Sequence, residues 1–302
     1  LPDLGYPPVQ YGGWESLRSN WYRTTASHNT VLVDGRAQVV ADGESTLWAE
    51  GEGFRVIRAS CPEMIGGTQY ERTVAMVDLS PRDSYLLDIF RVTGGKEHAY
   101  FLHSHFATLR PQGLALQPSE PFLRDAQMRD YRCDPAPAPG WSVDWEIEDR
   151  YRLLPRGKQV RLRYTGLTTG AEVGTAESWV ALWSFADEEE AWIPRLMVRR
   201  RRRRAPLAST FVGVLEPYER QPMVVAARRM PLQTASGKRC PDGHVAVEVQ
   251  LADGRSDLLV FADPAVAVAA VIQPDWQVSL EGGSCLMRRD KRGLVRQQET
   301  LG

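Results

Sequence analysis

Short runs of β-branched and aromatic residues recur along the whole chain, and Gly, Pro, Asp and Asn separate them. Clear examples are residues 72–77, 85–92 and 99–106. Within residues 145–153 apolar and charged residues alternate, which is the period of a strand with one face in water. We expect no helix longer than a few turns. The pattern predicts an all-β fold, specifically a large antiparallel β-sandwich.

The chain is long enough to bury a large core, because 43% of its 302 residues are hydrophobic. Prolines at alternate positions of residues 134–140 remove amide hydrogens that a central strand needs, so this segment is predicted to be a long loop or a seam between subdomains. We divide the chain into an interdomain segment leading into the β region (1–27), the main β-sandwich (28–217), and a continuing sheet or small C-terminal β subdomain (218–302).

The formal net charge of −1 gives no global attraction to nucleic acid or to an anionic membrane, so we expect neither as a partner. No apolar stretch of the sequence is long enough to span a bilayer. Residues 199–204 form a run of arginines, which we interpret as the solvated tip of a hairpin, with contact to an anionic polysaccharide as the alternative. The cysteines lack a metal-binding spacing and are expected to be free, buried thiols: Cys61, Cys133, Cys240 and Cys285.

The main functional signal lies in residues 27–38, where His28 and Asn29 precede an apolar run at residues 31–33. The run predicts a buried strand, and Asp34-Gly35 predicts the turn that closes it. A polar pair that enters a buried strand needs hydrogen-bonding partners or a cleft.

Together with Leu1-Pro2-Asp3-Leu4-Gly5-Tyr6-Pro7 and Trp21-Tyr22-Arg23-Thr24-Thr25, this segment resembles the start of the β-rich C-terminal region of the heparinase II/III-like polysaccharide lyases, which include oligo-alginate lyases. The resemblance extends more weakly through Glu71-Arg72-Thr73-Val74 and residues 85–92 and 98–106. It implies that the β-sandwich follows an α/α-toroid domain. Because the sequence lacks an initiator Met and opens inside the motif, we expect a fragment or a processed C-terminal portion.

The resemblance also implies a reaction, the β-elimination of a uronic-acid-containing glycan. In the family, the tyrosine and most of the carboxylate-neutralising residues belong to the α/α-toroid, and a histidine of the β region closes the cleft. His28 matches that histidine. The implied partners are an anionic polysaccharide or oligosaccharide, alginate-like or heparan-like, and an upstream α/α-toroid domain. The implied location is periplasmic or secreted.

His28 is therefore the candidate catalytic residue, and Tyr22, Arg23 and Asn29 are candidate substrate-binding residues. Two alternatives stay open: His28 could be a core histidine that orders the domain junction, and Asn29 could bond a neighbouring loop. The aromatic residues of the N-terminal segment could stack on sugar rings, but we favour a seam between domains for them.

His103 and His105 flank one residue, so in a strand their side chains would share a face and could bind one metal ion. Several relatives in the resembling family hold a structural zinc in the β region with two histidines and an aspartate. By this resemblance the candidate ligands are His103, His105 and Asp42, with His28 as a further member of the set. The alternative is that the histidine pair binds no metal. Apart from this zinc, no cofactor is expected.

Two other functions are compatible with the sequence. The first is a non-catalytic carbohydrate-binding or structural β-module, which would be indicated if His28 faced a packed sheet rather than a polar cleft edge. The second is a hydrolase with paired carboxylates, for which the dense acid cluster is Asp144, Glu146, Glu148 and Asp149. Glu146 and Glu148 alternate with apolar residues, so a wet sheet surface explains them adequately.

Overall fold

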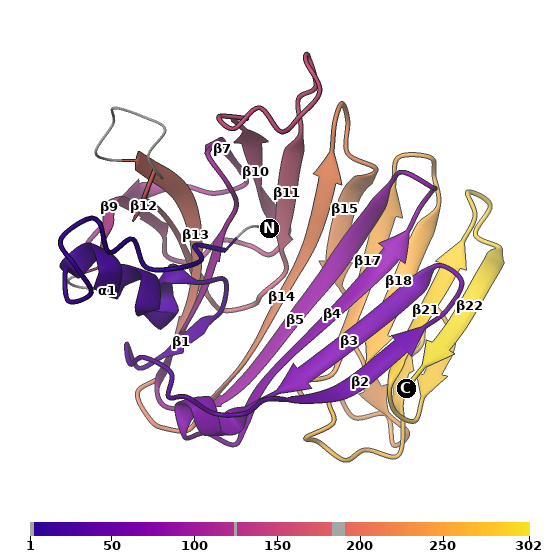
Figure 1. Ribbon diagram of the computed structural model, residues 1–302. Coiled ribbons are helices and arrows are strands. Elements are labelled where there is room, and N and C mark those ends of the chain that lie inside the picture. The colour runs from indigo at the N-terminus through magenta and orange to yellow at the C-terminus, as the bar shows by residue number, and fades with distance from the viewer. Residues whose placement is uncertain (1–2, 124–125, 183–190) are drawn as a thin grey trace.

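Antiparallel strands make up most of the computed structural model, which describes residues 3–123, 126–182 and 191–302 (Figure 1). The all-β prediction is therefore confirmed. Residues 1–2, which open the N-terminal motif, lie outside the described part. In chain order the elements are α1 (Leu17–Arg23), η1 (Thr25–Ser27), β1 (Val31–Val33), β2 (Glu44–Glu50), β3 (Phe54–Ser60), η2 (Pro62–Ile65), β4 (Gln69–Asp78), β5 (Ser84–Gly94), β6 (Glu97–His103), β7 (Ala107–Gln112), β8 (Gln117–Pro118), β9 (Met128–Asp134), β10 (Trp141–Ile147), β11 (Arg161–Gly166), β12 (Glu172–Val180), β13 (Ala191–Arg201), β14 (Leu207–Tyr218), β15 (Val224–Arg229), β16 (Gln233–Thr234), β17 (Val245–Leu251), β18 (Ser256–Phe261), β19 (Val271–Gln273), β20 (Val278–Leu280), β21 (Ser284–Arg289) and β22 (Val295–Leu301).

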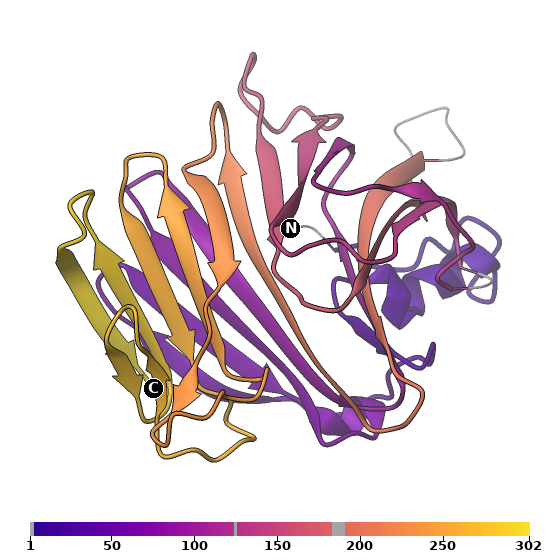
Figure 2. The ribbon, with the colours of Figure 1, turned by 180° about the vertical axis from the view of Figure 1, so that it is seen from behind.

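Three large sheets are stacked in the molecule (Figure 2). An eight-stranded sheet, β2-β3-β4-β5-β14-β11-β10-β7, lies in the middle. A six-stranded sheet, β1-β6-β13-β12-β9-β8, packs on one of its faces, and a five-stranded sheet, β15-β17-β18-β21-β22, packs on the other. A small three-stranded sheet, β16-β19-β20, covers the outer face of the five-stranded sheet. The predicted antiparallel sandwich is thus present.

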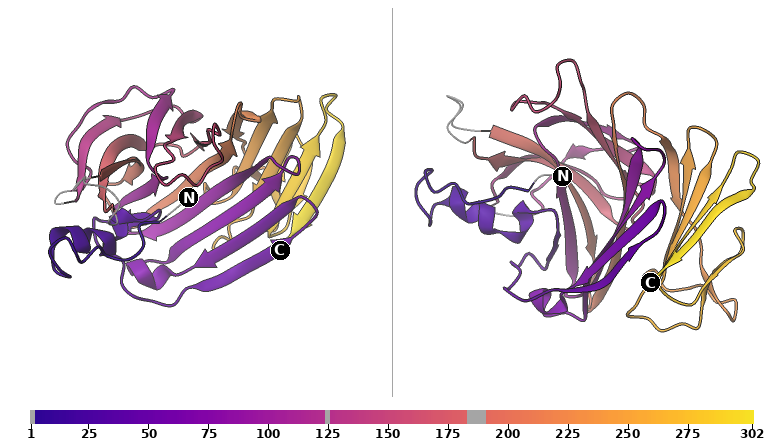
Figure 3. Two further views of the ribbon diagram at one scale, coloured as in Figure 1. Left: turned by 45° about the horizontal axis from the view of Figure 1, so that its top comes forward. Right: turned by 45° about the vertical axis from the view of Figure 1, so that its right-hand side comes forward.

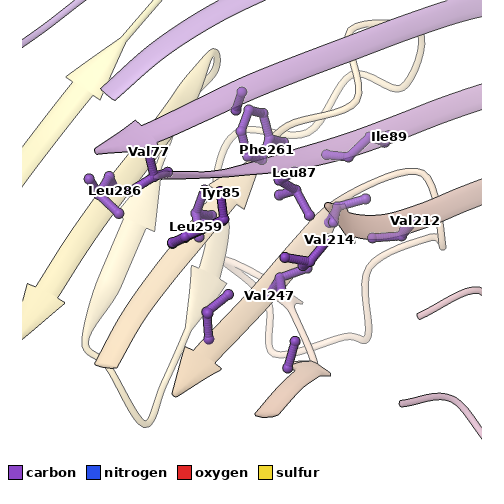
Figure 4. Packing of buried hydrophobic residues seen from close by; sticks show 14 of the residues in the cluster. Val77, Tyr85, Leu87, Ile89, Val212, Val214, Val247, Leu259, Phe261 and Leu286 are labelled. Carbon is purple, nitrogen blue, oxygen red and sulfur yellow. The ribbon is translucent and has the colours of Figure 1, made fainter. Parts of the chain in front are cut away.

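The middle sheet is buried on both faces, and β5 shows how its sequence achieves this. Tyr85, Leu87 and Ile89 pack against the five-stranded sheet and are 0% exposed (Figure 4). Phe90 and Val92 belong to the cluster shared with the six-stranded sheet. Successive side chains of a strand point to opposite faces, so a strand covered on both sides needs apolar residues at most positions. Each fully buried side chain of this kind contributes about 1.5–3 kcal/mol.

A bent ribbon of two paired strands connects the middle sheet to the six-stranded sheet. β5 pairs with β14 in the middle sheet, and their continuations β6 and β13 pair in the other. At the bend Gly94 pairs with Leu207 and Glu97 pairs with Arg201, so residues 95–96 oppose residues 202–206. Strands that switch sheets make such corners, and a bulge lengthens one side of them.

The arginine run lies on the longer side of this corner. The prediction of a hairpin tip at residues 199–204 is wrong, because β13 and β14 pair with other strands in two different sheets rather than with each other. The solvated part of that prediction holds for residues 202–204, which are exposed.

The N-terminal segment covers the outer face of the six-stranded sheet (Figure 3). Ser16 caps α1 by accepting a hydrogen bond from the backbone of Ser19. Trp21 and Tyr22 of this helix are buried in one cluster with Phe101 of β6. The proposed division of the chain near residues 27 and 217 stays a prediction.

Residues 135–140 connect β9 to β10 and so carry the chain from the six-stranded sheet to the middle sheet, as expected of a segment that cannot form a strand. All four cysteines are free thiols, and three of them are buried. Within the described residues, no helix is long and apolar enough to cross a membrane.

Candidate functional site

Strand β1 holds the His28 segment beside β6 in the six-stranded sheet. Residues 31–33 are buried, as predicted. Asp34 and Gly35 have φ values of 50° and 66°, and two positive φ values are the signature of a tight type I′ turn. The Asp34 carboxylate accepts hydrogen bonds from the backbone amides of Lys96 and Glu97 at 2.7 and 2.9 Å. These contacts fix the turn against the bent ribbon.

Two arginines hold the backbone that precedes β1, and they come from opposite sheets. Arg195 of β13 donates hydrogen bonds to the carbonyl oxygens of Ser27 and His28 at 3.0 and 3.2 Å. Arg72 of β4 donates to the carbonyl oxygen of Asn29 at 2.8 Å. Three consecutive carbonyl groups are therefore fixed by charged donors, which make stronger hydrogen bonds than neutral ones.

The His28 side chain is 33% exposed and both of its ring nitrogens are engaged. Nδ1 lies 2.8 and 3.0 Å from the two carboxylate oxygens of Asp3, and Nε2 lies 3.0 Å from the carbonyl oxygen of Tyr22. Both partners can only accept hydrogen bonds, so this arrangement requires an N–H on each nitrogen. The geometry therefore suits the imidazolium form of His28, a cation at a polar, partly exposed edge.

The side chain of Asn29 hydrogen-bonds the backbone at the end of β6. Its Oδ1 accepts a hydrogen bond from the backbone amide of His103 at 2.7 Å, and its Nδ2 donates to the carbonyl oxygen of His103 at 3.3 Å. This is the bonding to a neighbouring segment that the sequence left open as an alternative. A contact of Asn29 with substrate stays a prediction.

His103 is the last residue of β6 and is 1% exposed. Its Nδ1 lies 3.2 Å from Nη2 of Arg195, and a guanidinium can only donate, so the ring proton of the neutral His103 must lie on Nε2. Burial and the nearby charges of Arg195 and His28 lower the pKa of His103 to about 2. Its buried Nε2 has no hydrogen-bond partner in the described part of the chain.

Arg195 is fully buried, and burial lowers its pKa to about 9, while the charge of Asp3 opposes this shift. The guanidinium lies 5.6 Å from the ring centroids of both Trp21 and Phe101, within the range of cation–π attraction. Among the residues described, no carboxylate forms an ion pair with it. Arg195 is thus a buried cation that is stabilised by backbone carbonyls and aromatic faces.

A cavity of about 180 Å³ lies next to these residues. Its wall includes Asp3, Tyr22, His103, His105 and Tyr151. The hydroxyl of Tyr22 accepts a hydrogen bond from the backbone amide of Ala181 at 2.7 Å. Burial raises the pKa of Tyr22 to about 12, so its phenol stays protonated near neutral pH.

The residues predicted to bind zinc do not form a metal site. Strand β6 ends at His103, so His105 lies in the following bend and the expected shared strand face does not exist. His105 instead packs edge-on against Phe106 and Tyr151, and Asp42 is an exposed residue outside any strand. Within the described ranges, no group of three or more His, Cys, Asp or Glu residues could hold a metal ion. Because these residues do not fit a zinc ion, we assign it no role in the chemistry.

Arg23 contacts its own helical segment and is not part of the cavity wall. Its Nη2 donates a hydrogen bond to the carbonyl oxygen of Trp14 at 2.7 Å and lies 3.8 Å from the Glu15 carboxylate. A role of Arg23 in substrate binding stays a prediction.

Three of the four acids considered for a hydrolase form ion pairs: Asp144, Glu146 and Glu148. Asp144 is bound by Nε and Nη2 of Arg163 at 3.0 and 2.9 Å. Glu146 lies 3.1 Å from Arg110 and 2.9 Å from Arg161. Carboxylates that are paired along one sheet face do not provide the free acid and base that glycoside hydrolysis needs.

Comparison with known proteins shows which family the N-terminal part of the chain resembles. Residues 1–110 match the family model described as heparinase II/III-like, C-terminal. The resemblance to the heparinase II/III-like family is confirmed. No curated protein matches the chain in sequence.

Two solved structures share the fold of this chain. A structure described as a heparinase III gene product has a TM-score of 0.54 at 14% identity, over 83% of this chain and 32% of its own. Heparan sulfate lyase HepC from Pedobacter heparinus has a TM-score of 0.52 at 18% identity, over 86% of this chain and 34% of its own. At these identities the likeness concerns the fold. The chain spans about a third of the length of either structure.

Sequence reasoning singled out His28 in this heparinase II/III-like segment but missed the residues that surround it. Asp3, Arg195 and Tyr151 were not assigned to the site, although each lies in the cavity wall or contacts the His28 backbone. One signal was available for Arg195, which is a charged residue inside an otherwise apolar strand and therefore needs buried partners.

Proposed function

We propose that this chain is the β region of a polysaccharide lyase that cleaves a uronate-containing glycan, alginate-like or heparan-like, by β-elimination. The observation that carries the proposal is His28, held between the Asp3 carboxylate and the Tyr22 carbonyl beside a polar cavity. The family match over residues 1–110 supports the reaction class. We place the reaction in the periplasm or outside the cell, where such polymers are encountered.

β-Elimination at a uronate moves protons and breaks one carbon–oxygen bond. A base removes the proton from the carbon next to the carboxylate, the electron pair forms a carbon–carbon double bond, and the bond to the glycosidic oxygen breaks. An acid then gives that oxygen a proton. Negative charge gathers on the carboxylate as the first proton leaves, so a fixed cation beside it lowers the barrier.

The imidazole of His28, which is hydrogen-bonded at both ring nitrogens, meets this requirement. Its Nδ1 already holds a carboxylate, that of Asp3, and a uronate presents the same chemical group. The Asp3 side chain is 59% exposed, so a substrate carboxylate can displace it while the Tyr22 carbonyl keeps Nε2 in place. His28 is then the cation that neutralises the substrate carboxylate.

Two of the described residues around His28, Tyr22 and His103, are not suited to act as the base. The phenol of Tyr22 is protonated near neutral pH, and Nδ1 of His103 is occupied by Arg195. We therefore assign the base, and the remaining groups that hold the carboxylate, to an upstream α/α-toroid domain. The cavity volume of about 180 Å³ is consistent with a site completed by a second domain, because complete ligand sites enclose about 300–1,000 Å³.

The test is the ultraviolet absorbance of the unsaturated uronate product. We expect the 302-residue chain alone to yield none, and a protein that also contains the α/α-toroid to yield it from an alginate or heparan polymer. In that longer protein His28→Ala should lower kcat by about 10²- to 10³-fold, the usual cost of removing one fixed group that stabilises charge in the transition state. The melting temperature should change little, because the His28 side chain is partly exposed.

Lys158→Gln is the matched control, since it removes a surface cation that pairs with Glu219 away from the cavity. It should retain both activity and stability. Loss of activity in proportion to loss of folded protein in His28→Ala would instead support the structural role of this histidine. Turnover by the isolated chain that depends on His28 would overturn the assignment of the base to another domain.

A further inference from the structure

A second cavity, of about 620 Å³, lies at the other end of β13 from the His28 site. Ile193 lines the first cavity and Arg200 lines the second. Arg200 lies seven positions after Ile193 along the strand, which corresponds to about 23 Å. The wall of the second cavity contains four arginines and one carboxylate: Arg200, Arg228, Arg229, Arg239 and Asp242.

Several hydrogen-bond donors in this wall lack an acceptor. Arg229 uses Nη2 to donate to the carbonyl oxygens of Asp242 and His244 at 3.1 and 3.3 Å, whereas its buried Nε and Nη1 have no partner within the described chain. Buried polar groups normally have partners, so unpaired donors that line one cavity call for an acceptor that binds there.

His244 adds a further donor of the same kind. It is 2% exposed, and its Nδ1 accepts a hydrogen bond from the backbone amide of Asp263 at 3.0 Å. The proton of the neutral ring therefore lies on Nε2, which is buried and also has no partner among the residues described. Burial lowers the pKa of His244 and keeps the ring neutral, so Nε2 is available as a donor.

The carboxylate of Asp242 does not balance the positive charge of the wall. It lies 3.3 Å from Nη2 of Arg229 and 3.7 Å from Nη1 of Arg200. Outside the wall, Glu248 pairs with Arg228 at 2.6 Å, so two carboxylates face four arginines. Burial and the neighbouring charges of Arg91 and Arg200 lower the pKa of Arg229, against the opposing effect of Asp242. The cavity thus combines unpaired donors with an excess of positive charge.

The corner of the bent ribbon adds charge at the same end of β13. Residues 202–204 are exposed arginines that directly follow the strand end containing Arg200 (Figure 1). Exposed charges act over about 8 Å at physiological ionic strength, which is enough to attract a polyanion to the mouth of a neighbouring cavity.

We propose that this second cavity binds a sulfate or carboxylate group of an acidic glycan, at a distance from the His28 cavity. The choice of a glycan rests on the proposed lyase function. Guanidinium groups bind both oxyanions through paired N–H donors, and the His244 N–H supplies one more. The volume lies within the range of about 300–1,000 Å³ that is typical of ligand sites. Such a site holds the polymer by a unit that is not being cleaved.

The experiment titrates the 302-residue chain by calorimetry with a heparin hexasaccharide, an alginate hexamer and inorganic sulfate. The double variant Arg200→Gln/Arg239→Gln removes two cavity charges. The control Arg110→Gln/Arg296→Gln removes two exposed arginine charges elsewhere, with side chains 62% and 59% exposed. We expect at least 10-fold weaker oligosaccharide binding in the cavity variant and less than 3-fold in the control, with unchanged melting temperatures in both.

The outcomes separate the sources of the oxyanion. Binding of the heparin hexasaccharide alone assigns the site to sulfate, and binding of both oligosaccharides shows that a carboxylate is sufficient; either result supports the site. Equal losses in the two double variants, binding of inorganic sulfate alone, or no binding would overturn it. Because binding is read without turnover, failure of the elimination assay would refute the lyase proposal and leave this result standing.

Discussion

Arg195 and His103 share a hydrogen bond, and both side chains are buried. A buried arginine keeps its proton more readily than a buried imidazole gains one, because the unperturbed pKa values of the two groups are several units apart. The pair therefore consists of one cation and one neutral ring. The resulting N–H on His103 is unpaired at the cavity wall, and Arg195 fixes the backbone that carries His28.

The state of His103 gives a pH dependence whose sign can be derived. Its folded pKa of about 2 lies below the unfolded value of about 6.5, so its contribution to stability is complete above pH 6.5 and decreases as the pH falls toward 2. At pH 5 the wild-type chain should have lost about 2 kcal/mol of unfolding free energy through this one group. His103→Gln keeps an acceptor for Arg195 but does not titrate.

Urea unfolding at pH 7 and pH 5 measures this difference. The variant should be less stable than wild type at pH 7 and regain about 2 kcal/mol relative to it at pH 5. His98 and His244, whose pKa values are also lowered by burial, titrate in both proteins and cancel in the comparison. A stability difference that is the same at both pH values would show that His103 is not held neutral.

At the scale of residues, the sequence predicts those features of the site whose residues are neighbours in the chain. His28, Asn29, the strand at residues 31–33 and the Asp34-Gly35 turn follow one another, and their pattern is visible without the fold. The partners of His28 are not local, since Asp3 lies 25 residues before it and Arg195 lies 167 residues after it. No pattern within a window of residues encodes such a pairing.

The bent ribbon determines the geometry at the scale of elements. Gly95 lies on its shorter side with a φ of 48°, and a Cβ atom there would lie 2.7 Å from both Val33 Cγ1 and Asp34 Oδ2. The bend and the β1 turn therefore touch at a position that only glycine fits. The turn cannot move without also moving the end of β1 at Val33.

Gly95→Ala should therefore be costly, and Gly66→Ala provides a matched control. Gly66 has a φ of 59° with nothing within 4 Å of the added Cβ, so it reports backbone strain alone, about 1–2 kcal/mol. Gly95→Ala should cost that amount and a further ~1–3 kcal/mol for the forced displacement. Chemical unfolding of both variants measures the two costs. Equal destabilisation would mean that the β1 turn yields to the extra atom freely.

The strands themselves could be predicted from period-two patterns, but their ends and partners could not. The prediction that His103 and His105 share a strand face is wrong, because β6 ends at His103. The prediction of a hairpin at residues 199–204 is wrong, because the flanking strands, β13 and β14, belong to different sheets. Alternation indicates which side chains of a strand are buried, but it carries no information about where a strand stops or which strand lies beside it.

At the scale of the whole molecule, the middle sheet belongs to two cores at once. Leu87 and Ile89 face the five-stranded sheet, and Phe90 and Val92 of the same strand face the six-stranded sheet. The sequence predicted a sandwich, and the nearly continuous apolar run at residues 85–92 is typical of a strand covered on both sides. The sequence did not predict that there are three stacked sheets, because the apolar pattern of a strand does not identify which sheet covers a given face.

Shared burial of this kind should make unfolding a single event across the predicted boundary near residue 217. Leu259 of β18 is 0% exposed in the core between the middle and five-stranded sheets, so Leu259→Ala should cost about 2–5 kcal/mol. Scanning calorimetry should show one transition in both proteins, shifted down as a whole in the variant. Two separate transitions, with only one shifted, would show that residues 218–302 unfold independently.

At the corner formed by residues 202–206, the peptide link contributes little to holding the flanking strands in place. On one side β13 is held by β6 and β12, and on the other β14 is held by β5 and β11, so the ladder bonds hold both strand ends without the peptide link between them. A gene divided at this corner would encode two polypeptides that find each other by strand pairing. The molecule could therefore be divided here into a two-part reporter. The first polypeptide would contain the His28 site, and the second would complete the sheets that support it.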